Sequence, residues 1–372
     1  MLASQLGIRL MLLVGENIPR PASCELMSAI TQVHVNNSDD TGDGFQISLT
    51  LGKNKLQDYM LLKSGDLNLF NRMIIAVVMG VMPEVLIDGV ITNHQISPSN
   101  DPGMSTLTVT GTDISKMMDL EESNVPYENQ SSSVMVGCIL ANYARYGIIP
   151  ALTQTSDVYT NLELKRWQYG TDLKCIQSLA GDNGFVFYIE PVSVGTSTAY
   201  WGPKMLTGAL QPALSIGMGG ATNVKSLSFS EEGLTAESVK ASFIEPFSKT
   251  QIELPAVPPL QLPPISSTPT PSKKVTLLRD TANKGAAATL MAMMSAVANQ
   301  PDTVGGNGEV DTARYGHVLR ARRLVGVRGA GVSYDGIYYV KGVSHRLSRG
   351  EYTQSFSLSR KGTGSLTPMV IT

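Results

Sequence analysis

Charged residues are scarce in this chain. Asp, Glu, Lys and Arg make up 16% of its 372 residues, and the formal net charge at pH 7 is −2. Typical soluble domains carry about 25% charged residues. Without a basic excess, the composition gives no support to a nucleic-acid or anionic-lipid surface. Together with 17 methionines, the low charge favours a surface that partner subunits partly cover, although a large ordinary core would produce the same composition.

Motifs for catalysis and metal binding are also lacking. The three cysteines, Cys24, Cys138 and Cys175, cannot all pair within one chain, and their spacing matches no metal motif. The four histidines are isolated, and the sequence has no HExxH spacing, no GxSxG elbow and no P-loop. We therefore expect free thiols in a protein assembled in the cytosol, and no enzyme activity, metal or cofactor.

Long hydrophobic runs are absent as well. No apolar segment approaches the roughly 18 residues that a membrane-spanning helix needs. The apolar N-terminus is interrupted by Arg9 and lacks a small-residue cleavage site, which argues against a signal peptide. Alternation of Ile8, Leu10 and Leu12 with Arg9 and Met11 instead predicts a first β-strand ending before Gly15. We expect no membrane insertion.

The clearest strand pattern lies near the end of the chain. Two extended segments, Ile337–Ser344 and Tyr352–Arg360, flank a polar turn at Arg349-Gly350 and predict an antiparallel hairpin. Leu86–Gly111 shows a related pattern, with Gly89-Val90 in the place of Gly342-Val343. Either the chain contains a duplicated β unit, or two common hairpins resemble each other by coincidence.

Between these patterns the chain changes character. Ser131–Ser133 and Thr171-Asp172 are typical starts of helices that end near Gly147 and Gly181. Leu254–Pro271 is dense in proline and predicts an irregular linker or a strap on a neighbour. The predicted fold is mainly β with an α+β insert and two related antiparallel β-barrels. Its parts are a first barrel (1–115), the insert (116–222), a second barrel (223–254 and 306–362), a proline-rich excursion with an Ala/Met-rich helix (255–305) and a tail (363–372).

Hydroxyl side chains occupy one face of a strand in each related unit. They alternate with apolar residues that can fill a core, as period-two strands do. We propose that these small, uncharged faces line the lumen of a ring; the alternative is that they face outer solvent or a neighbouring subunit. The residues are Thr106, Thr108 and Thr110 in the first unit and Thr353, Ser355, Ser357 and Ser359 in the second.

Arginines form the one cluster of like charge. Nucleic-acid binding would require interleaved aromatic residues, and only Tyr315 lies near. Ion pairs or hydrogen bonds between subunits are the better interpretation. The cluster comprises Arg314, Arg320, Arg322, Arg323 and Arg328.

Several stretches, spread over most of the chain and in the family's order, resemble one known family. They include IPRPASCELMSAITQVHV, GFQISLTLGK, VLIDGVITNHQISPSNDPGMSTLTVTGTD, GTDLKCIQSLAGDNGFVFYIEP, TAYWGP, QPALSIGMGGATNVKSLSFS and the closing hairpin. This set is similar to the late control D family, the central baseplate hubs of contractile phage tails and extracellular contractile injection systems. No spike or needle pattern follows Arg360, so the resemblance is to a stand-alone hub without lysozyme or spike activity.

This resemblance implies a homotrimer. Two tail-tube-like barrels in each of three chains would form a pseudo-sixfold ring that adapts a sixfold inner tube to a threefold spike and encloses part of the channel. The implied partners are copies of the chain itself, the spike protein, inner tube proteins and baseplate wedge components. The particle would be a phage tail, a bacteriocin or an injection system, either released or surface-anchored.

A second function remains open from the sequence. A β-rich carbohydrate-binding or adhesin subunit of a similar particle could use Trp167 and Trp201 as a platform for sugar rings. Both tryptophans are also ordinary candidates for core or interface positions.

Overall fold

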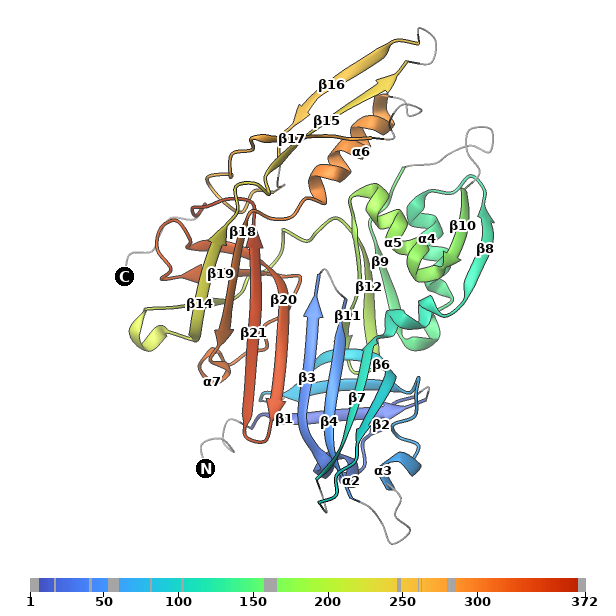
Figure 1. Ribbon diagram of the computed structural model, residues 1–372, viewed down its shortest axis with the longest axis vertical. Helices are drawn as coiled ribbons and strands as arrows, with labels where there is room; N and C mark the ends of the chain where they lie inside the picture. The colour runs from blue at the N-terminus through green and yellow to red at the C-terminus, as the bar shows by residue number, and fades with distance from the viewer. Residues whose placement is uncertain are drawn as a thin grey trace.

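The computed structural model is built mainly from antiparallel strands (Figure 1). It describes residues 7–16, 18–39, 42–52, 60–80, 82–101, 104–156, 166–245, 249–259, 261, 263–279, 281 and 286–366. Within these ranges, no helix combines the length and hydrophobicity needed to cross a membrane. All three cysteines are free thiols, as expected, and only Cys175 is buried.

The first β unit begins with the predicted N-terminal strand. A continuous apolar run forms β5, whose first six residues are buried, as expected for a strand covered on both faces. The elements are β1 (Arg9–Gly15), β2 (Arg20–Pro21), α2 (Cys24–Ala29), β3 (Ile30–Ser38), β4 (Gly44–Leu51), α3 (Met60–Lys63), β5 (Arg72–Val78), β6 (Pro83–Ser97) and β7 (Ser105–Asp113).

The insert follows β7 and contains both predicted helices. The Thr171 hydroxyl accepts a hydrogen bond from the Lys174 N–H and so caps α5, and Gly184 ends that helix in the left-handed conformation. The elements are η1 (Ile114–Asp119), β8 (Glu122–Tyr127), α4 (Ser132–Ala141), η2 (Ala144–Tyr146), β9 (Ile148–Leu152), β10 (Arg166–Thr171), α5 (Asp172–Asn183), β11 (Val186–Ser193) and β12 (Thr196–Gly202).

The second β unit contains the predicted hairpin, with its turn at Arg349-Gly350. Its first strand, β13, comes from a segment that we expected in the insert; it pairs in parallel with β19 instead. The elements are β13 (Gln211–Ser215), η3 (Gly219–Ala221), β14 (Val224–Glu231), β18 (Val304–Val310), α7 (Thr312–Tyr315), β19 (Leu324–Arg328), β20 (Gly336–Ser348) and β21 (Glu351–Arg360).

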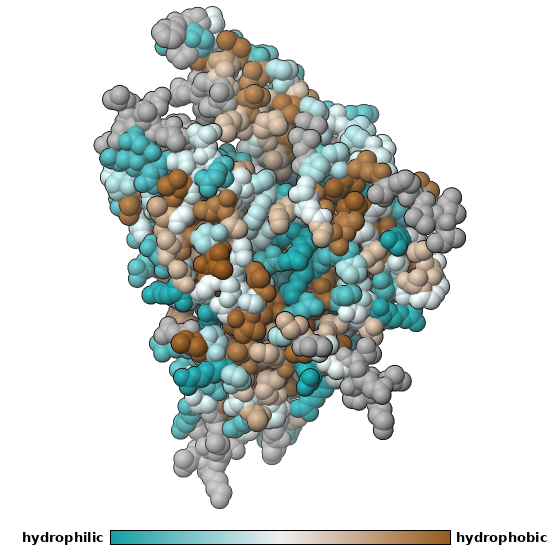
Figure 2. All heavy atoms as spheres, turned by 180° about the vertical axis from the view of Figure 1, so that it is seen from behind, coloured by the Kyte–Doolittle hydropathy of each residue, from teal (hydrophilic) through white to brown (hydrophobic). Residues whose placement is uncertain are grey.

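A separate arm interrupts the second unit (Figure 1, top). Three strands, β15 (Glu237–Ile244), β16 (Gln251–Val257) and β17 (Lys274–Leu277), pack against α6 (Ala286–Ala298). Its outer surface is partly hydrophobic, as are patches across the reverse face of the molecule (Figure 2). The Ser295 hydroxyl of α6 donates to the Gly181 carbonyl at 2.8 Å, which fastens the arm to the insert.

The arm corrects two expectations. We expected residues 238–243 in the second barrel, but β15 belongs to the arm. We also expected no regular structure over Leu254–Pro271, yet its first four residues lie in β16, an edge strand, where a proline is tolerated. The described part of the remaining stretch forms no strand, and Thr268 bridges to Thr363 near the end of the same chain.

One sheet joins both β units. Its strand order is β14-β18-β21-β20-β3-β4-β7-β6-β5-β1-β2; in addition, β19 pairs with β20, and β13 pairs with β19. The join is the antiparallel pairing of β20 with β3, from Gly342 opposite Ser38 to Ser348 opposite Gln32. Separate hydrophobic cores lie under each unit and inside the insert.

The two units are copies of one design. In spatial order, β14, β18, β21 and β20 correspond to β3, β4, β7 and β6, and β19 corresponds to β5. Bulges recur at equivalent places in the two units. Thr31 of β3 corresponds to Lys225 of β14, and Thr92 of β6 corresponds to Lys341 of β20. With the bulges aligned, Gly342 in the second unit corresponds to Asn93 in the first. The sequence pattern had matched Gly342 with Gly89, which lies four residues earlier.

A rare backbone conformation confirms this alignment. Phe70 and Arg322 both have left-handed φ angles, of 66° and 63°, and each lies two residues before the first residue of its strand, Arg72 of β5 and Leu324 of β19. The Phe70 N–H donates to the Ile91 carbonyl, and the Arg322 N–H donates to the Val340 carbonyl. Non-glycine residues seldom adopt this conformation, so its recurrence marks a true structural repeat.

Candidate functional site

A polar surface extends over eight neighbouring strands of the sheet. Residues directly opposite one another in paired strands point to the same face, so the registers define this surface, which we call the polar face. It runs without interruption through both β units, across the β20–β3 join. Its members are Ser226, Ser228, Ser230, Gly305, Asn307, Glu309, Thr353, Ser355, Ser357, Ser359, Gly342, Ser344, Arg346, Ser348, Gln32, His34, Asn36, Gly44, Gln46, Ser48, Thr50, Thr106, Thr108, Thr110, Asn93, Gln95 and Ser97.

The predicted hydroxyl residues all belong to the polar face. Thr106 and Ser355 are exposed, whereas Thr108, Thr110, Thr353 and Ser357 are half-buried. Thr106, Thr108 and Thr110 occupy the same positions in the first unit as Thr353, Ser355 and Ser357 in the second. Thus the structure brings together on one surface two rows that lie about 250 residues apart in the sequence.

Ser359 differs from the other six hydroxyl residues. It is 4% exposed and donates to the Asp302 carboxylate at 2.5 Å. Both residues line a pocket of about 700 Å³ at the end of the polar face, between the second unit, the insert and the arm. Ser359 is therefore committed to a contact within the chain.

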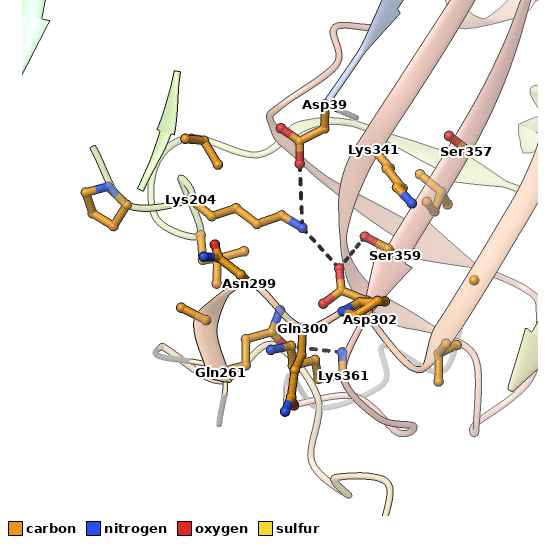
Figure 3. A pocket seen from close by; sticks show the side chains of 18 of the residues that line it. Asp39, Lys204, Gln261, Asn299, Gln300, Asp302, Lys341, Ser357, Ser359 and Lys361 are labelled. Atoms are coloured by element: carbon orange, nitrogen blue, oxygen red, sulfur yellow. Dashed lines mark hydrogen bonds and ion pairs between the residues drawn. The ribbon is translucent and has the colours of Figure 1, made fainter. Parts of the chain in front are cut away.

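Opposite charges lie close together in this pocket. The Lys204 ammonium lies 3.1 Å from Asp302 and 3.8 Å from Asp39 (Figure 3). Nearby, the buried Lys361 ammonium donates to the Val297 carbonyl at 3.0 Å. These groups hold the parts of the chain together. Lys341 also lines the pocket, so three lysines face the two aspartates and leave one excess positive charge.

Few charges interrupt the polar face itself. Glu309 forms an ion pair of 2.8 Å with Lys225 at the neighbouring bulge. At the join between the units, His34 Nε2 and the Ser344 hydroxyl lie 2.5 Å apart. Arg346 is exposed. Most of this surface consists of hydroxyl and amide groups, which bind water without retaining ions of either sign.

Four of the five arginines in the cluster make contacts within the chain, and their contacts between chains stay a prediction. Arg320 bonds to Glu84 and to the Val85 carbonyl of the first unit, and Arg323 reaches Glu190 of the insert. Arg314 contacts Asp311 and the Thr222 carbonyl. The Arg328 side chain is exposed. Sequence alone could not distinguish partners in the same chain from partners in another.

Arg322 makes the most buried of these contacts. Its guanidinium donates to both Asp43 carboxylate oxygens, at 2.6 and 3.0 Å, and to the Ser38 carbonyl at 2.7 Å. It also lies over the Tyr188 ring of the insert. Burial raises the pKa of nearby Asp113 to about 6, and the Asp43 carboxylate contributes to this rise. Arg322 thus joins both β units and the insert at one point.

The described residues hold no candidate metal centre, since no group of three His, Cys, Asp or Glu side chains converges. The buried His345 places Nδ1 2.9 Å from the Tyr352 hydroxyl, and burial lowers the pKa of this imidazole to about 3. It is therefore a neutral core residue.

The two tryptophans lie in different environments. Trp201 is fully buried in the core of the insert against Phe185. Trp167 is 41% exposed and stacks on Tyr169, with ring centroids 6.2 Å apart. Only Trp167 could contribute to a platform on the surface.

Comparison with known proteins identifies the fold. No known family model and no curated protein sequence matches the chain. Among solved structures, a tail protein from Neisseria meningitidis MC58 is similar with a TM-score of 0.66, 12% identity and coverage of 95% of this chain and 96% of that one. The 43 kDa tail protein of prophage MuSo2 from Shewanella oneidensis is similar with a TM-score of 0.64 and 12% identity. The match covers 95% of this chain and 98% of that one.

A bacterial secretion protein shares the fold as well. The E. coli c3393 protein, a type VI secretion component described as similar to the T4 tail proteins gp27 and gp5, has a TM-score of 0.55 and 13% identity. The match covers 92% of this chain and 77% of that one. The chain therefore has the fold of phage tail proteins and of a related secretion-system component.

Proposed function

We propose that this chain is a structural hub of a contractile, phage-tail-like particle, in which three copies close into a ring around a channel. The observation that carries the proposal is the polar face, which is continuous over two copies of one β unit. Three chains would supply six such units, the number needed to meet a sixfold tube on one side and a threefold spike on the other.

The composition of the polar face supports its assignment to the lumen. A conduit must be wetted but must not retain the molecules that pass through it. Serine, threonine, asparagine and glutamine side chains hydrate well, and the Lys225–Glu309 ion pair cancels two of the few charges nearby. The opposite side of the same strands is packed into the cores of the two units.

The resemblance to late control D proteins supports the choice of partners. They are the spike protein, inner tube proteins and baseplate wedge components, which would be assembled in the bacterial cytoplasm into a particle that is released or surface-anchored. The similarity of tail and type VI secretion folds agrees with this role. The hub would have no enzymatic activity of its own.

A carbohydrate-binding or adhesin role is the second candidate. The stacked, exposed rings of Trp167 and Tyr169 favour it, because aromatic faces pack on the C–H faces of sugars. The hub role depends on neither aromatic side chain. Glycan binding that is lost in Trp167→Ala while the protein still assembles would therefore assign this separate role to Trp167 and Tyr169.

Assembly tests the hub. We expect light scattering to give three times the chain mass of 39.8 kDa, for the chain alone or with its spike protein, and negative-stain images to show small rings. An obligate interface would bury more than about 2,000 Å² per pair. A stable soluble monomer, both alone and with the spike protein, would refute the proposal.

A further inference from the structure

Two edges of the large sheet are open in the isolated chain. Among the described residues, β14 pairs only with β18, and the segment Asn93–Ser97 of β6 pairs only with β7, since β5 reaches no further than Val90. These edges lie at opposite ends of the polar face. Unpaired strand edges are templates for another strand.

The chain already contains a paired example of the same two edges. Because β20 corresponds to β6 and β3 to β14, the internal β20–β3 join is the junction that β6 and β14 would form between copies. At the internal join, Arg346 lies opposite His34 and Ser344 lies opposite Asn36. The equivalent residues of β6 and β14 follow from the aligned bulges. They set Ser97 opposite Ser228 and Gln95 opposite Ser230.

Phe70 occupies the position that Arg322 has at the internal join. Arg322 is 5% exposed because it reaches across the join to Ser38 and Asp43. Phe70 has the same strained backbone but is 54% exposed, beside Leu69 at 50%. A large apolar residue in a left-handed conformation is unfavourable both for the backbone and for its contact with water.

An exposed apolar residue lies at the equivalent place beside the β14 edge. Ser38 corresponds to Glu232, and Leu234, two residues further on, is 85% exposed. On the side of the sheet opposite the polar face, Ile96 is 39% exposed on β6, and the register sets it opposite Phe229 of β14. The two edges are therefore complementary in backbone groups and in apolar surface.

We propose that the ring closes by antiparallel pairing of the β6 edge of one copy with the β14 edge of the next, with Phe70 packed against the neighbour's Glu232–Leu234 segment. This inference rests on the proposed ring and specifies its interface. The internal ion pair of Arg322 is replaced between chains by an apolar contact. The polar face then continues unbroken from copy to copy.

Disulfide trapping tests the register. In a chain whose exposed Cys24 and Cys138 are replaced by serine, we expect Ser97→Cys with Ser228→Cys to give covalent dimers and trimers on mild oxidation. Directly opposed residues lie within disulfide reach. The matched control, Asn93→Cys with Ser228→Cys, is displaced by four residues, or about 13 Å, and should give none.

Phe70 provides an independent test. Phe70→Gly removes the left-handed strain, so the monomer should melt at a higher temperature while the ring dissociates at least tenfold more readily. Phe70→Asp should abolish the ring, Phe70→Leu should retain it, and Leu290→Asp, an equally exposed site on α6, should leave it unchanged.

The outcomes separate the interface from the function. A trimer that forms without cross-linking at Ser97 and Ser228, or that tolerates Phe70→Asp, would overturn the proposed junction and leave the hub intact. Equal cross-linking in the displaced control would also overturn it. Absence of any oligomer, with or without the spike protein, would overturn the hub and the junction together.

Discussion

Replacing Arg322 by methionine is expected to lower the free energy of unfolding by about 3–5 kcal/mol, the usual effect of removing one partner from a buried ion pair. The substitution leaves the Asp43 carboxylate, which is 5% exposed, without its counter-ion. It also releases the Ser38 carbonyl and the contact with Tyr188. Urea denaturation followed by the fluorescence of the buried Trp201 would measure the change.

Arg323 supplies the matched control. It is one residue away, but its ion pair with Glu190 is half exposed on the arginine side, so Arg323→Met should change stability by about 1 kcal/mol or less. Adding Asp43→Asn to Arg322→Met should recover part of the loss, because no buried charge then remains unpaired. Equal losses for the two arginine variants would show that Arg322 is not the point that joins the units.

Gly111→Ala is the second change with a large expected effect, a loss of about 3 kcal/mol or failure to fold. A Cβ atom at this position would lie 2.3 Å from the Val90 carbonyl oxygen and 2.3 Å from the Phe45 ring. The ring could move, but the carbonyl belongs to the β6 backbone and could move only by breaking the β6–β7 pairing. Thermal denaturation of the purified variant would show the loss.

Gly181 allows a control of the same chemistry. It lies inside α5, and a Cβ atom there would meet nothing within 4 Å. Gly181→Ala should therefore raise stability, by up to about 1 kcal/mol. Phe45→Leu combined with Gly111→Ala should remain destabilised, because the carbonyl contact persists. Full recovery in that double variant would assign the effect to the ring instead.

Local patterns predicted the elements well. Alternation located β1 and the β20–β21 hairpin, and capping residues located α4 and α5, because these signals depend on neighbours in the sequence. The repeat of hydroxyl residues in β7 and β21 was also visible, since solvent-facing positions of equivalent strands kept the same chemistry. The fold class followed from these elements.

Long-range pairing was beyond the sequence. The strands β13 and β15 have ordinary strand patterns, and nothing in those patterns states which sheet each one joins. Arg320, Arg322 and Arg323 looked like an interface cluster, but their partners lie more than 100 residues away in the same chain. In the sequence, Ser359 likewise resembles its hydroxyl neighbours. Its hydrogen bond to Asp302 is visible only in the structure.

Phe70 carried no sequence signal at all. An aromatic residue between Leu69 and Asn71 resembles part of an ordinary turn, and its left-handed backbone appears only in three dimensions. Its equivalence with Arg322 depends on hydrogen bonds to Ile91 and Val340, which are far from either residue in sequence. Structural repeats whose side chains have diverged are found through backbone geometry, which sterics restrict more tightly than sequence.

Labelling of the polar face in the assembled particle tests the central claim most directly. Thr108→Cys and Ser355→Cys place one thiol in each β unit, in the background without Cys24 and Cys138, and Leu290→Cys on exposed α6 serves as the outer reference. If the polar face lines the lumen, both thiols will react with a small maleimide and resist one attached to a bulky polymer, whereas Leu290→Cys will react with both. Equal reaction of all three thiols with the bulky reagent in intact rings would place the polar face outside and contradict the hub.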